Sequence, residues 1–391
     1  MDPIPILKDL IAIPSVNPMG RELSGPEYLE TRLTAYLEDL FSSRSIEYQR
    51  IEVAPGRCNV IARLDQPGRR RTVLLDAHQD TVPIDGMTIP PFKPLERDGR
   101  IYGRGACDVK GGLAAMLAAF IRLARERPPG AANVVISCTC DEESTVLGIT
   151  DLVRLWSDTD RAGSLLSSPP DMAIIAEPTE LDVVVAHRGA VRWRIRTRGR
   201  ACHSSRPSEG VNAIYRMAKV LNVLEQYAAD LPASIPAHPL CGPATLSVGR
   251  IQGGVSVNTV PDECAIEIDR RLVPGEDGWR ARQDVIDVLR ERLDFEPAHD
   301  EPWIAGATLS DDNNGDLADR LMAHIADVAG PHLKIGVPYG THASRTAAAG
   351  VPSVVFGPGN IEQAHTDDEW IDADQVRLAS EVYYRFCAAE G

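Results

Sequence analysis

The sequence predicts an α/β fold that is interrupted in its middle by an α+β unit. As far as residue 186, short apolar stretches that resemble buried strands alternate with stretches of helical periodicity, which is typical of a largely parallel sheet. Between residues 187 and 300, polar and apolar residues alternate within the strands, as in antiparallel strands with one wet face. The first pattern then returns, so we expect segments 1–186 and 301–391 to form one discontinuous domain around the inserted domain 187–300.

The composition is that of an ordinary globular protein. A chain of 391 residues exceeds what one core usually supports, and 43% hydrophobic and 25% charged residues are typical fractions. The net charge of −15 argues against nucleic acid and anionic membranes as partners. No secretory signal and no membrane span of roughly 20 apolar residues is recognisable. The eight cysteines are scattered, so we expect reduced thiols in a cytoplasmic protein.

The elements of the first segment follow from periodicity. Apolar runs predict strands over 46–53, 58–64, 73–77, 132–140 and 171–176. Helical spacing predicts helices over 26–40, 113–125 and 146–156. Cys138 and Cys140 stand in a strand-like run without a matching second pair, so we interpret them as core residues rather than zinc ligands. The loop G-R-G-A-C-D-V-K-G-G lacks both nucleotide-binding spacings, and the polar residue that it presents is Asp108.

The inserted domain and the last segment have different patterns. In the insert, arginines 192, 194, 196, 198 and 200 alternate with apolar residues or Thr197, which predicts a strand with a solvated face, although an acidic partner is an alternative. Further strands are expected over 245–251 and 264–271, and helices after Gly210 and over 280–293. The last segment predicts helices over 316–328 and 373–388, a short helix after Gly340, and strands over 333–337 and 352–356.

Acid and imidazole side chains occur just past predicted strands or in the glycine-rich loop at five places. They are His78 with Asp80, Asp108, Glu142 with Glu143, Glu177, and His365. In open α/β sheets ligands bind outside the carboxyl ends of the strands, so these side chains can converge on one site. Two histidines and three carboxylates suit a pair of zinc-like ions that share one carboxylate, activate a water between them and need a general base nearby.

Seven segments in order carry a resemblance to a known family. They are D-A-H-Q-D-T-V-P, G-R-G-A-C-D-V-K-G-G, T-C-D-E-E-S, A-E-P-T-E, G-R-A-C-H-S-S-R-P, N-T-V-P-D and G-P-G-N-I-E-Q-A-H-T-D-D-E. They span residues 76–369, nearly the whole chain, and the sequence resembles the M20 family of metallopeptidases. The resemblance implies a discontinuous, mixed-sheet catalytic domain of the zinc-peptidase type, with an inserted ferredoxin-like α+β domain that serves as lid and dimerisation domain.

The resemblance implies a role for each matching residue of the catalytic domain. The metal ligands would be His78 and Glu177 for one zinc ion, Glu143 and His365 for the other, and Asp108 as the bridge between them. Glu142 would be the general base that deprotonates the water between the ions and later protonates the leaving amine. Asp80 would orient His78 as its hydrogen-bond partner.

In the inserted domain the resemblance implies contacts with the substrate. His203 would stabilise the oxyanion across a dimer interface, and Asn258 and Arg271 would contact the substrate. Arg270 could replace Arg271 after a one-residue change of register. In the catalytic domain His342 departs from the small or acidic residue that many family members have in the Gly-Thr turn, which affects the substrate rather than the metal chemistry.

The implied activity is hydrolysis of the amide bond of an N-acyl amino acid by a cytoplasmic homodimer with two Zn²⁺, replaceable by Co²⁺, in each subunit. The segments A-E-P-T-E and G-P-G-N-I-E-Q-A-H-T are most similar to acetylornithine deacetylase, an activity of arginine biosynthesis. A succinyl-diaminopimelate desuccinylase is the second hypothesis, and a glutamate-type carboxypeptidase or dipeptidase is the third. A non-catalytic metal-binding dimer is a remote alternative, because all five ligands and Glu142 are present.

Overall fold

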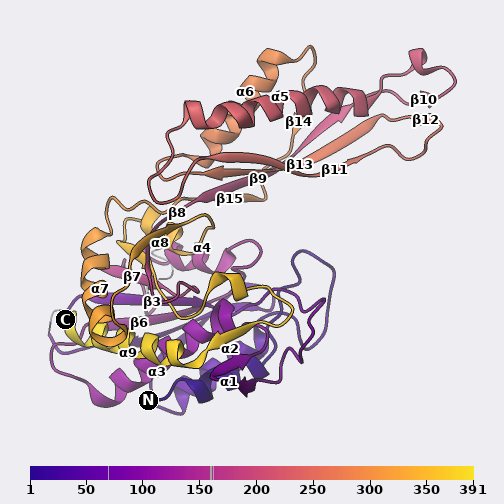
Figure 1. Ribbon diagram of the computed structural model, residues 1–391. Coiled ribbons are helices and arrows are strands. Elements are labelled where there is room, and N and C mark those ends of the chain that lie inside the picture. The colour runs from indigo at the N-terminus through magenta and orange to yellow at the C-terminus, as the bar shows by residue number, and fades with distance from the viewer. Residues whose placement is uncertain (69, 159–160, 162) are drawn as a thin grey trace. The chain divides into compact units, whose positions relative to one another are not determined.

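The computed structural model describes residues 1–68, 70–158, 161 and 163–391. The chain divides into two compact units (Figure 1). Unit 1 comprises Met1–Val185, Asp311–Ile335 and Thr341–Gly391, and unit 2 comprises Ala186–Ser310 and Gly336–Gly340. The second boundary lies at Ser310 rather than at residue 300, because strand β15 (Ile304–Gly306) pairs with β9 (Gly189–Arg198) of unit 2.

The predicted α/β class is confirmed by a large mixed sheet with the strand order β1-β2-β6-β3-β7-β17-β8-β16. Its strands are β1 (Glu47–Ala54), β2 (Arg57–Leu64), β3 (Thr72–His78), β6 (Asn133–Thr139), β7 (Met172–Ile175), β8 (Val183–His187), β16 (Lys334–Val337) and β17 (Ser353–Val355). Strands β6, β3, β7 and β17 pair in parallel, whereas β1 with β2, β2 with β6 and β8 with β17 pair antiparallel. The sheet is therefore less parallel than the sequence pattern indicated, because β1 and β2 form a hairpin.

Helices and a small second sheet complete unit 1. The helices are α1 (Ile4–Ala12), α2 (Thr31–Ser42), α3 (Gly111–Glu126), α4 (Leu147–Arg154), α7 (Gly315–Ala329), α8 (Ala343–Ala348) and α9 (Ala373–Ala389), with the short helices η1 (Ala106–Lys110) and η4 (Ile361–Gln363). The second sheet pairs β4 (Leu95–Arg97), β5 (Arg100–Tyr102) and β18 (Trp370–Asp372). Among the described residues, no helix is long and apolar enough to cross a membrane.

Strand β3 separates the apolar core from the polar site. Val73, Leu75 and Ala77 belong to the main core, which also contains most of the buried side of α3. Because side chains alternate across a strand, Asp76 and His78 lie on the opposite face of the sheet. Parallel pairing with β6 and β7 brings the carboxyl ends of three strands together beside His78. The fold thus gathers the residues that follow these strands at one edge.

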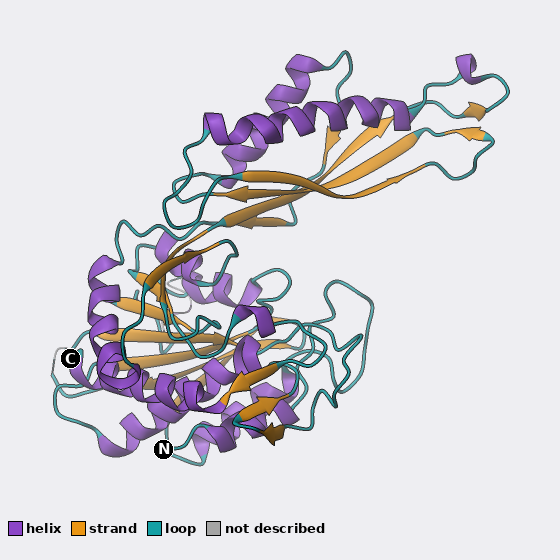
Figure 2. Ribbon diagram, in the orientation of Figure 1, coloured by secondary structure: helices purple, strands orange, loops and turns teal. Residues whose placement is uncertain are grey.

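Unit 2 has an antiparallel sheet with helices on one face (Figure 2). The strand order is β11-β13-β9-β14, and β15 also pairs with β9. Its elements are β9 and β15, β11 (Thr245–Gly253), β13 (Glu263–Leu272), β14 (Ala298–His299), α5 (Ala213–Ser234) and α6 (Gly278–Arg292), with the short helix η3 (Pro207–Glu209). Trp193 and Ile266 lie in the core between sheet and helices. The helices cover the apolar face that the alternating pattern predicted.

The opposite face of this sheet carries the alternating arginines. Three of them form ion pairs with acidic residues of the same unit: Arg192–Asp269 at 3.1 Å, Arg194–Glu267 at 2.7 Å and Arg196–Asp300 at 2.6 Å. These arginine side chains are 33–40% exposed. The charges of these three arginines are therefore neutralised within their own unit, as expected for a solvated face.

Candidate metal centre

His78 is the last residue of β3, and its ring is fixed from both nitrogens. Its Nδ1–H donates to the main-chain carbonyl of Asp80 at 2.9 Å, and its Nε2 lies 3.1 Å from Oδ1 of Asp108. The residue is only 2% exposed. The contact with the carbonyl leaves Nε2 as the nitrogen that faces the acidic groups, which is the arrangement of a metal-ligating imidazole.

Asp108 lies between the two histidines predicted as ligands. It is part of the tight turn η1, and it is 7% exposed. Its Oδ1 faces His78, whereas its Oδ2 lies 3.2 Å from Nε2 of His365. One carboxylate thus contacts an imidazole with each oxygen, as the bridging ligand of a two-ion site would.

Glu143 and Glu177 complete the predicted ligand set. Oε2 of Glu143 lies 3.3 Å from Nε2 of His365. Within the described chain, ligand atoms of His78, Asp108 and Glu143 all lie within 4.8 Å of one another. Glu177 follows β7 and is 6% exposed. Its pKa is raised well above the ordinary value by burial and by the charge of Asp108, so it belongs to the same electrostatic cluster.

The electrostatics of the cluster are those of crowded negative charges. Burial, followed by the charges of Glu143 and Asp108, raises the pKa of Glu142 to about 8 although His78 opposes this. Burial and the charge of Asp108 raise the pKa of Glu143 to about 7. Hydrogen bonds with Asp108 and Glu143 raise the pKa of His365 to about 10. The imidazoles are therefore cationic, and they supply the positive charge that stabilises the neighbouring carboxylates.

The pKa values of the two other members fit this description. Burial would lower the pKa of His78, but the hydrogen bond to Asp108 and the surrounding acids raise it well above the ordinary value. Burial would raise the pKa of Asp108, but the hydrogen bonds with His365 and His78 hold it well below the ordinary value. Asp108 is therefore ionised, as a shared ligand has to be.

The residues present fit a pair of divalent cations. Imidazole nitrogens and carboxylate oxygens are the donors that zinc-like ions take. Oε1 of Glu143 is buried and has no hydrogen-bond partner among the described residues. Such a buried acceptor is costly unless something occupies it. Divalent cations would also offset the repulsion that raises the pKa values of Glu142 and Glu143.

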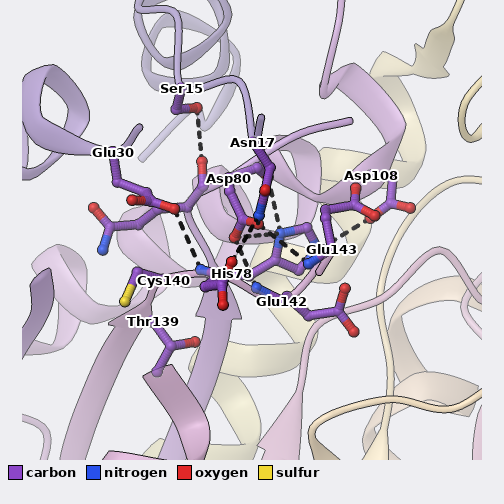
Figure 3. A network of polar contacts seen from close by, with 12 residues as sticks. Ser15, Asn17, Glu30, His78, Asp80, Asp108, Thr139, Cys140, Glu142 and Glu143 are labelled. Atoms are coloured by element: carbon purple, nitrogen blue, oxygen red, sulfur yellow. Dashed lines mark hydrogen bonds and ion pairs between the residues drawn. The ribbon is translucent and has the colours of Figure 1, made fainter. Parts of the chain in front are cut away.

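Asp80 supports the site in a different way from the predicted one. Its carboxylate oxygen Oδ1 lies 3.7 Å from Nδ1 of His78, so the orienting hydrogen bond comes from its main-chain carbonyl. The carboxylate accepts the backbone N–H groups of Glu142 at 3.0 Å and Glu143 at 3.1 Å (Figure 3). Asp80 thus holds the turn that carries both glutamates, and it orients His78 through its main chain.

A buried network behind Asp80 was not predicted. Nδ2 of Asn17 donates to Oδ2 of Asp80 at 2.8 Å (Figure 3). It also donates to Oδ1 of Asp141 at 2.9 Å. Arg57 donates to Oδ1 of Asn17 at 3.2 Å and pairs with both Glu30 and Asp141 at 2.8 Å. All five residues are buried. One guanidinium therefore serves two carboxylates in the layer that supports the site.

Some of these supporting residues stand in recognisable sequence motifs, and others do not. Asn17 stands in I-P-S-V-N-P, where proline-flanked polar residues indicate a specific turn. Glu369 ends the same segment that presents His365, and it contacts the Asp108 loop. Arg57 has no local signal, because its role arises only when the β1–β2 hairpin folds back on the site.

His342 is a buried partner of Asp76. Its Nδ1 lies 2.8 Å from Oδ2 of Asp76, and the residue is 1% exposed. Its ring stands edge-on to that of His78, with 6.4 Å between the ring centroids. His342, which departs from the family pattern in the Gly-Thr turn, thus places its imidazole next to the carboxylate of Asp76. Both lie directly behind the predicted metal ligand His78.

Unit 2 contains the three residues predicted to contact the substrate. His203 and Asn258 are exposed neighbours at a small two-stranded sheet, where β10 (Cys202–His203) pairs antiparallel with β12 (Thr259–Val260). The backbone N–H of Ser204 donates to the carbonyl of Asn258 at 2.9 Å. Arg271 lies apart from them, near the end of β13. The structure of this unit therefore brings His203 and Asn258 together, but not Arg271 with them.

The register of β13 separates the two candidate arginines. Arg270 is 0% exposed and forms an ion pair with Glu276 at 2.5 Å on the helix-covered face. The side chain of Arg271 is 28% exposed on the other face and pairs with Asp269 at 2.9 Å. Because Arg270 is itself buried and paired with Glu276, Arg271 is the one of the two that is accessible to a substrate.

Comparisons with known proteins show which family the sequence resembles. The sequence profile of peptidase family M20/M25/M40 matches residues 74–389. An acetylornithine deacetylase of Pectobacterium carotovorum subsp. carotovorum (strain PC1) is 31% identical, covering 98% of this chain and 97% of the relative. An acetylornithine deacetylase of Proteus mirabilis (strain HI4320) is 32% identical, with 99% and 97% covered.

Solved structures resemble the fold over its full length. The M20 family metallo-carboxypeptidase Sso-CP2 of Sulfolobus solfataricus has a TM-score of 0.78 at 17% identity, covering 100% of this chain and 99% of that one. The YXEP protein of Bacillus subtilis, described as a dinuclear metal binding peptidase, has a TM-score of 0.68 at 17% identity, with 99% and 96% covered.

Proposed function

Because the chain belongs to peptidase family M20/M25/M40 and is therefore a metal-dependent hydrolase of amide bonds, we propose that it removes the acyl group from an N-acyl amino acid, with N-acetylornithine as the first candidate. The observation that carries the proposal is the cluster of His78, Asp108, Glu143 and His365 beside Glu142 at the carboxyl ends of the strands. The relatives named acetylornithine deacetylase support the choice of substrate.

We propose the following ligands for two Zn²⁺, with Co²⁺ as a possible replacement. His78 and Glu177 would hold one ion, Glu143 and His365 the other, and Asp108 both. When bound, the ions would polarise the amide carbonyl and lower the pKa of water to near neutrality. The Bacillus subtilis protein described as dinuclear supports the number of ions.

Glu142 is the proposed general base. It is next to the ligand Glu143, and its backbone is held by Asp80. Burial raises the pKa of Glu142 to about 8, so the carboxyl group can hold a proton near neutral pH. It would take the proton of the attacking water and pass it to the departing amine. Bound cations would lower this pKa toward the range that suits a base.

Residues of unit 2 would bind and stabilise the substrate. The partly exposed guanidinium of Arg271 suits a substrate carboxylate, and the exposed amide of Asn258 suits a polar group. His203 is exposed on the adjacent strand, and we propose that it stabilises the oxyanion in the site of a second subunit. We also propose that the protein is a cytoplasmic homodimer that acts in arginine biosynthesis.

The test is removal and return of the metal. The protein is dialysed against a chelator, and hydrolysis of N-acetylornithine, N-succinyl-diaminopimelate and N-acylglutamates is measured before and after addition of Zn²⁺ or Co²⁺. We expect activity to vanish with the metal, to return with either ion, and to be highest with N-acetylornithine. Activity that is indifferent to the chelator would contradict the metal mechanism. A preference for one of the other substrates would replace acetylornithine deacetylase by a desuccinylase or a glutamate-type carboxypeptidase.

A further inference from the structure

One buried carboxylate outside the predicted ligand set accepts hydrogen bonds from the backbone of the turn that carries Asp108. Glu369 is 1% exposed, and four N–H groups donate to it. We infer that Glu369 is a positioning residue that locks Asp108 and His365 at the spacing required to share a metal ion. The inference rests on the metal site proposed above.

The two oxygens of Glu369 divide the donors between them. Oε1 accepts from the backbone N–H of Cys107 at 2.8 Å and of Asp108 at 3.0 Å. Oε2 accepts from the backbone N–H of Gly105 at 2.9 Å and from Nη1 of Arg104 at 2.8 Å. A turn that gives three of its N–H groups to one side chain has little freedom to move Asp108.

The same segment presents the histidine that Asp108 contacts. Glu369 follows His365 by four residues, and further hydrogen bonds join the two segments. The backbone N–H of Gly103 donates to the carbonyl of Glu369 at 3.0 Å, and Nη1 of Arg104 donates to the carbonyl of Thr366 at 3.3 Å. Segments 103–108 and 365–369 therefore move as one piece, which fixes the 3.2 Å between Asp108 and His365.

Only a carboxylate can satisfy this set of donors. Each oxygen of Glu369 faces two N–H groups, so the NH₂ group of a glutamine would point at two donors whichever way it was turned. One pair of donors would lose its acceptor, and the turn would shift to find another. Loss of such an outer partner of a metal ligand typically lowers metal affinity or activity about 10–100-fold.

The experiment measures Zn²⁺ affinity of the metal-free full chain by competition with a chromophoric chelator. Four variants are compared with the wild type. Glu369→Gln removes the proposed clamp, and Asp108→Asn removes a proposed ligand. Glu362→Gln changes an exposed glutamate in the same loop. Asn314→Ala removes buried hydrogen bonds to the carbonyls of Val185 and Ser353 in unit 1, away from both segments.

We expect Glu369→Gln to weaken binding of at least one Zn²⁺ by 10–100-fold, and to lower kcat with little change in KM. The d–d spectrum of the Co²⁺-loaded variant should also change. Glu362→Gln should match the wild type. Asn314→Ala should lower the melting temperature without changing Zn²⁺ affinity, which separates positioning from general stability.

Two results would overturn the inference, and they can be told apart. If Asp108→Asn weakens Zn²⁺ binding but Glu369→Gln does not, the clamp has no positioning role and the proposed function stands. If the wild type binds no Zn²⁺, or if Asp108→Asn binds it normally, the metal site itself is wrong and the inference falls with it.

A measurement on the wild type covers the case in which Glu369→Gln does not fold. Hydrogen exchange of segment 103–110 is followed in the metal-free protein. Because the N–H groups of Gly105, Cys107 and Asp108 donate to a buried carboxylate, they should exchange at least 100-fold more slowly than those of the exposed segment around Glu362. Rapid exchange of these amides without metal would contradict a preformed clamp.

Discussion

The metal centre in unit 1 and the sheet face in unit 2 both carry many charged side chains, but they arrange them in opposite ways. At the metal centre, Glu142, Glu143 and Glu177 are crowded together and partly or fully buried, and burial raises the pKa of each. On the sheet face, arginines alternate with acids of neighbouring strands, and the pair Arg194–Glu267 is partly exposed.

The difference shows which charges carry function. Like charges that are crowded and buried cost free energy, so a fold keeps them only for a task, such as binding cations and moving protons. Opposite charges on a wet face neutralise one another and are screened by solvent, so each contributes little. The following changes test this contrast, in order of the expected effect.

The largest effect is expected from Glu142→Gln. Loss of a general acid and base typically slows a reaction by about 10²–10⁴-fold, so kcat should fall by that factor. Metal content should stay that of the wild type, because Glu142 is not among the proposed ligands. Steady-state kinetics and metal analysis on the same sample check both points. Loss of metal together with turnover would mean that Glu142 and Glu143 have exchanged roles.

The second largest effect is expected on stability, from removing one partner of a buried pair. His342→Ala leaves Asp76 buried without its imidazole, which should lower the free energy of unfolding by about 3–5 kcal/mol. The matched control is His332→Ala, which breaks a half-buried histidine pair with Asp182 and should cost at most about 1 kcal/mol. Urea unfolding measures the loss of unfolding free energy in both variants. Equal losses would show that burial does not determine the cost of breaking such a pair.

The burial of Glu30 should make stability depend on pH. Burial, followed by the charge of Asp80, raises the pKa of Glu30 to about 8, although Arg57 opposes this. Between pH 4.5 and 8 the folded protein therefore binds a proton that the unfolded chain has lost, so the free energy of unfolding decreases as the pH rises through this window.

Glu30→Gln cannot lose a proton, and it should flatten this dependence. Melting temperatures of wild type and variant are compared from pH 5 to pH 8.5, without metal. We expect the wild type to lose more stability than the variant as the pH rises. Parallel curves would show that Glu30 is ionised in the folded protein throughout this range.

The smallest effect is expected on the sheet face of unit 2. Arg194→Ala removes a partly exposed pair with Glu267, and the change in unfolding free energy should lie within about 1 kcal/mol. The difference from wild type should shrink further in 1 M salt, where screening acts over about 3 Å. A larger loss of unfolding free energy that does not depend on salt would show that the charges on this face behave like the buried, functional ones.

The sequence allowed the class of fold and the ligands to be predicted because both follow local rules. Strands β3, β6 and β7 are apolar runs that end in polar residues, so His78, Glu142 and Glu177 could be placed at one edge of a sheet. The arginine row of β9 revealed its wet face by strict alternation. These signals need no knowledge of distant contacts.

The supporting contacts could not be predicted, because they join segments that are far apart in the chain. Asn17 meets Asp80 and Asp141 only after its segment pairs with the residues that follow β3. Asp80 supplies a carbonyl rather than a carboxylate to His78, a choice that depends on the local path of the backbone. Glu369 reaches the Asp108 turn across about 260 residues of chain.

The most direct test of the central claim is anomalous diffraction from crystals of the Zn²⁺-loaded full chain at the zinc edge. We predict two peaks per chain about 3.5–4 Å apart. One would be bound by His78 and Glu177, the other by Glu143 and His365, with Asp108 between them. A single peak outside this cluster, or no peak near Asp108 in protein that is active and loaded with metal, would contradict the proposed metal centre.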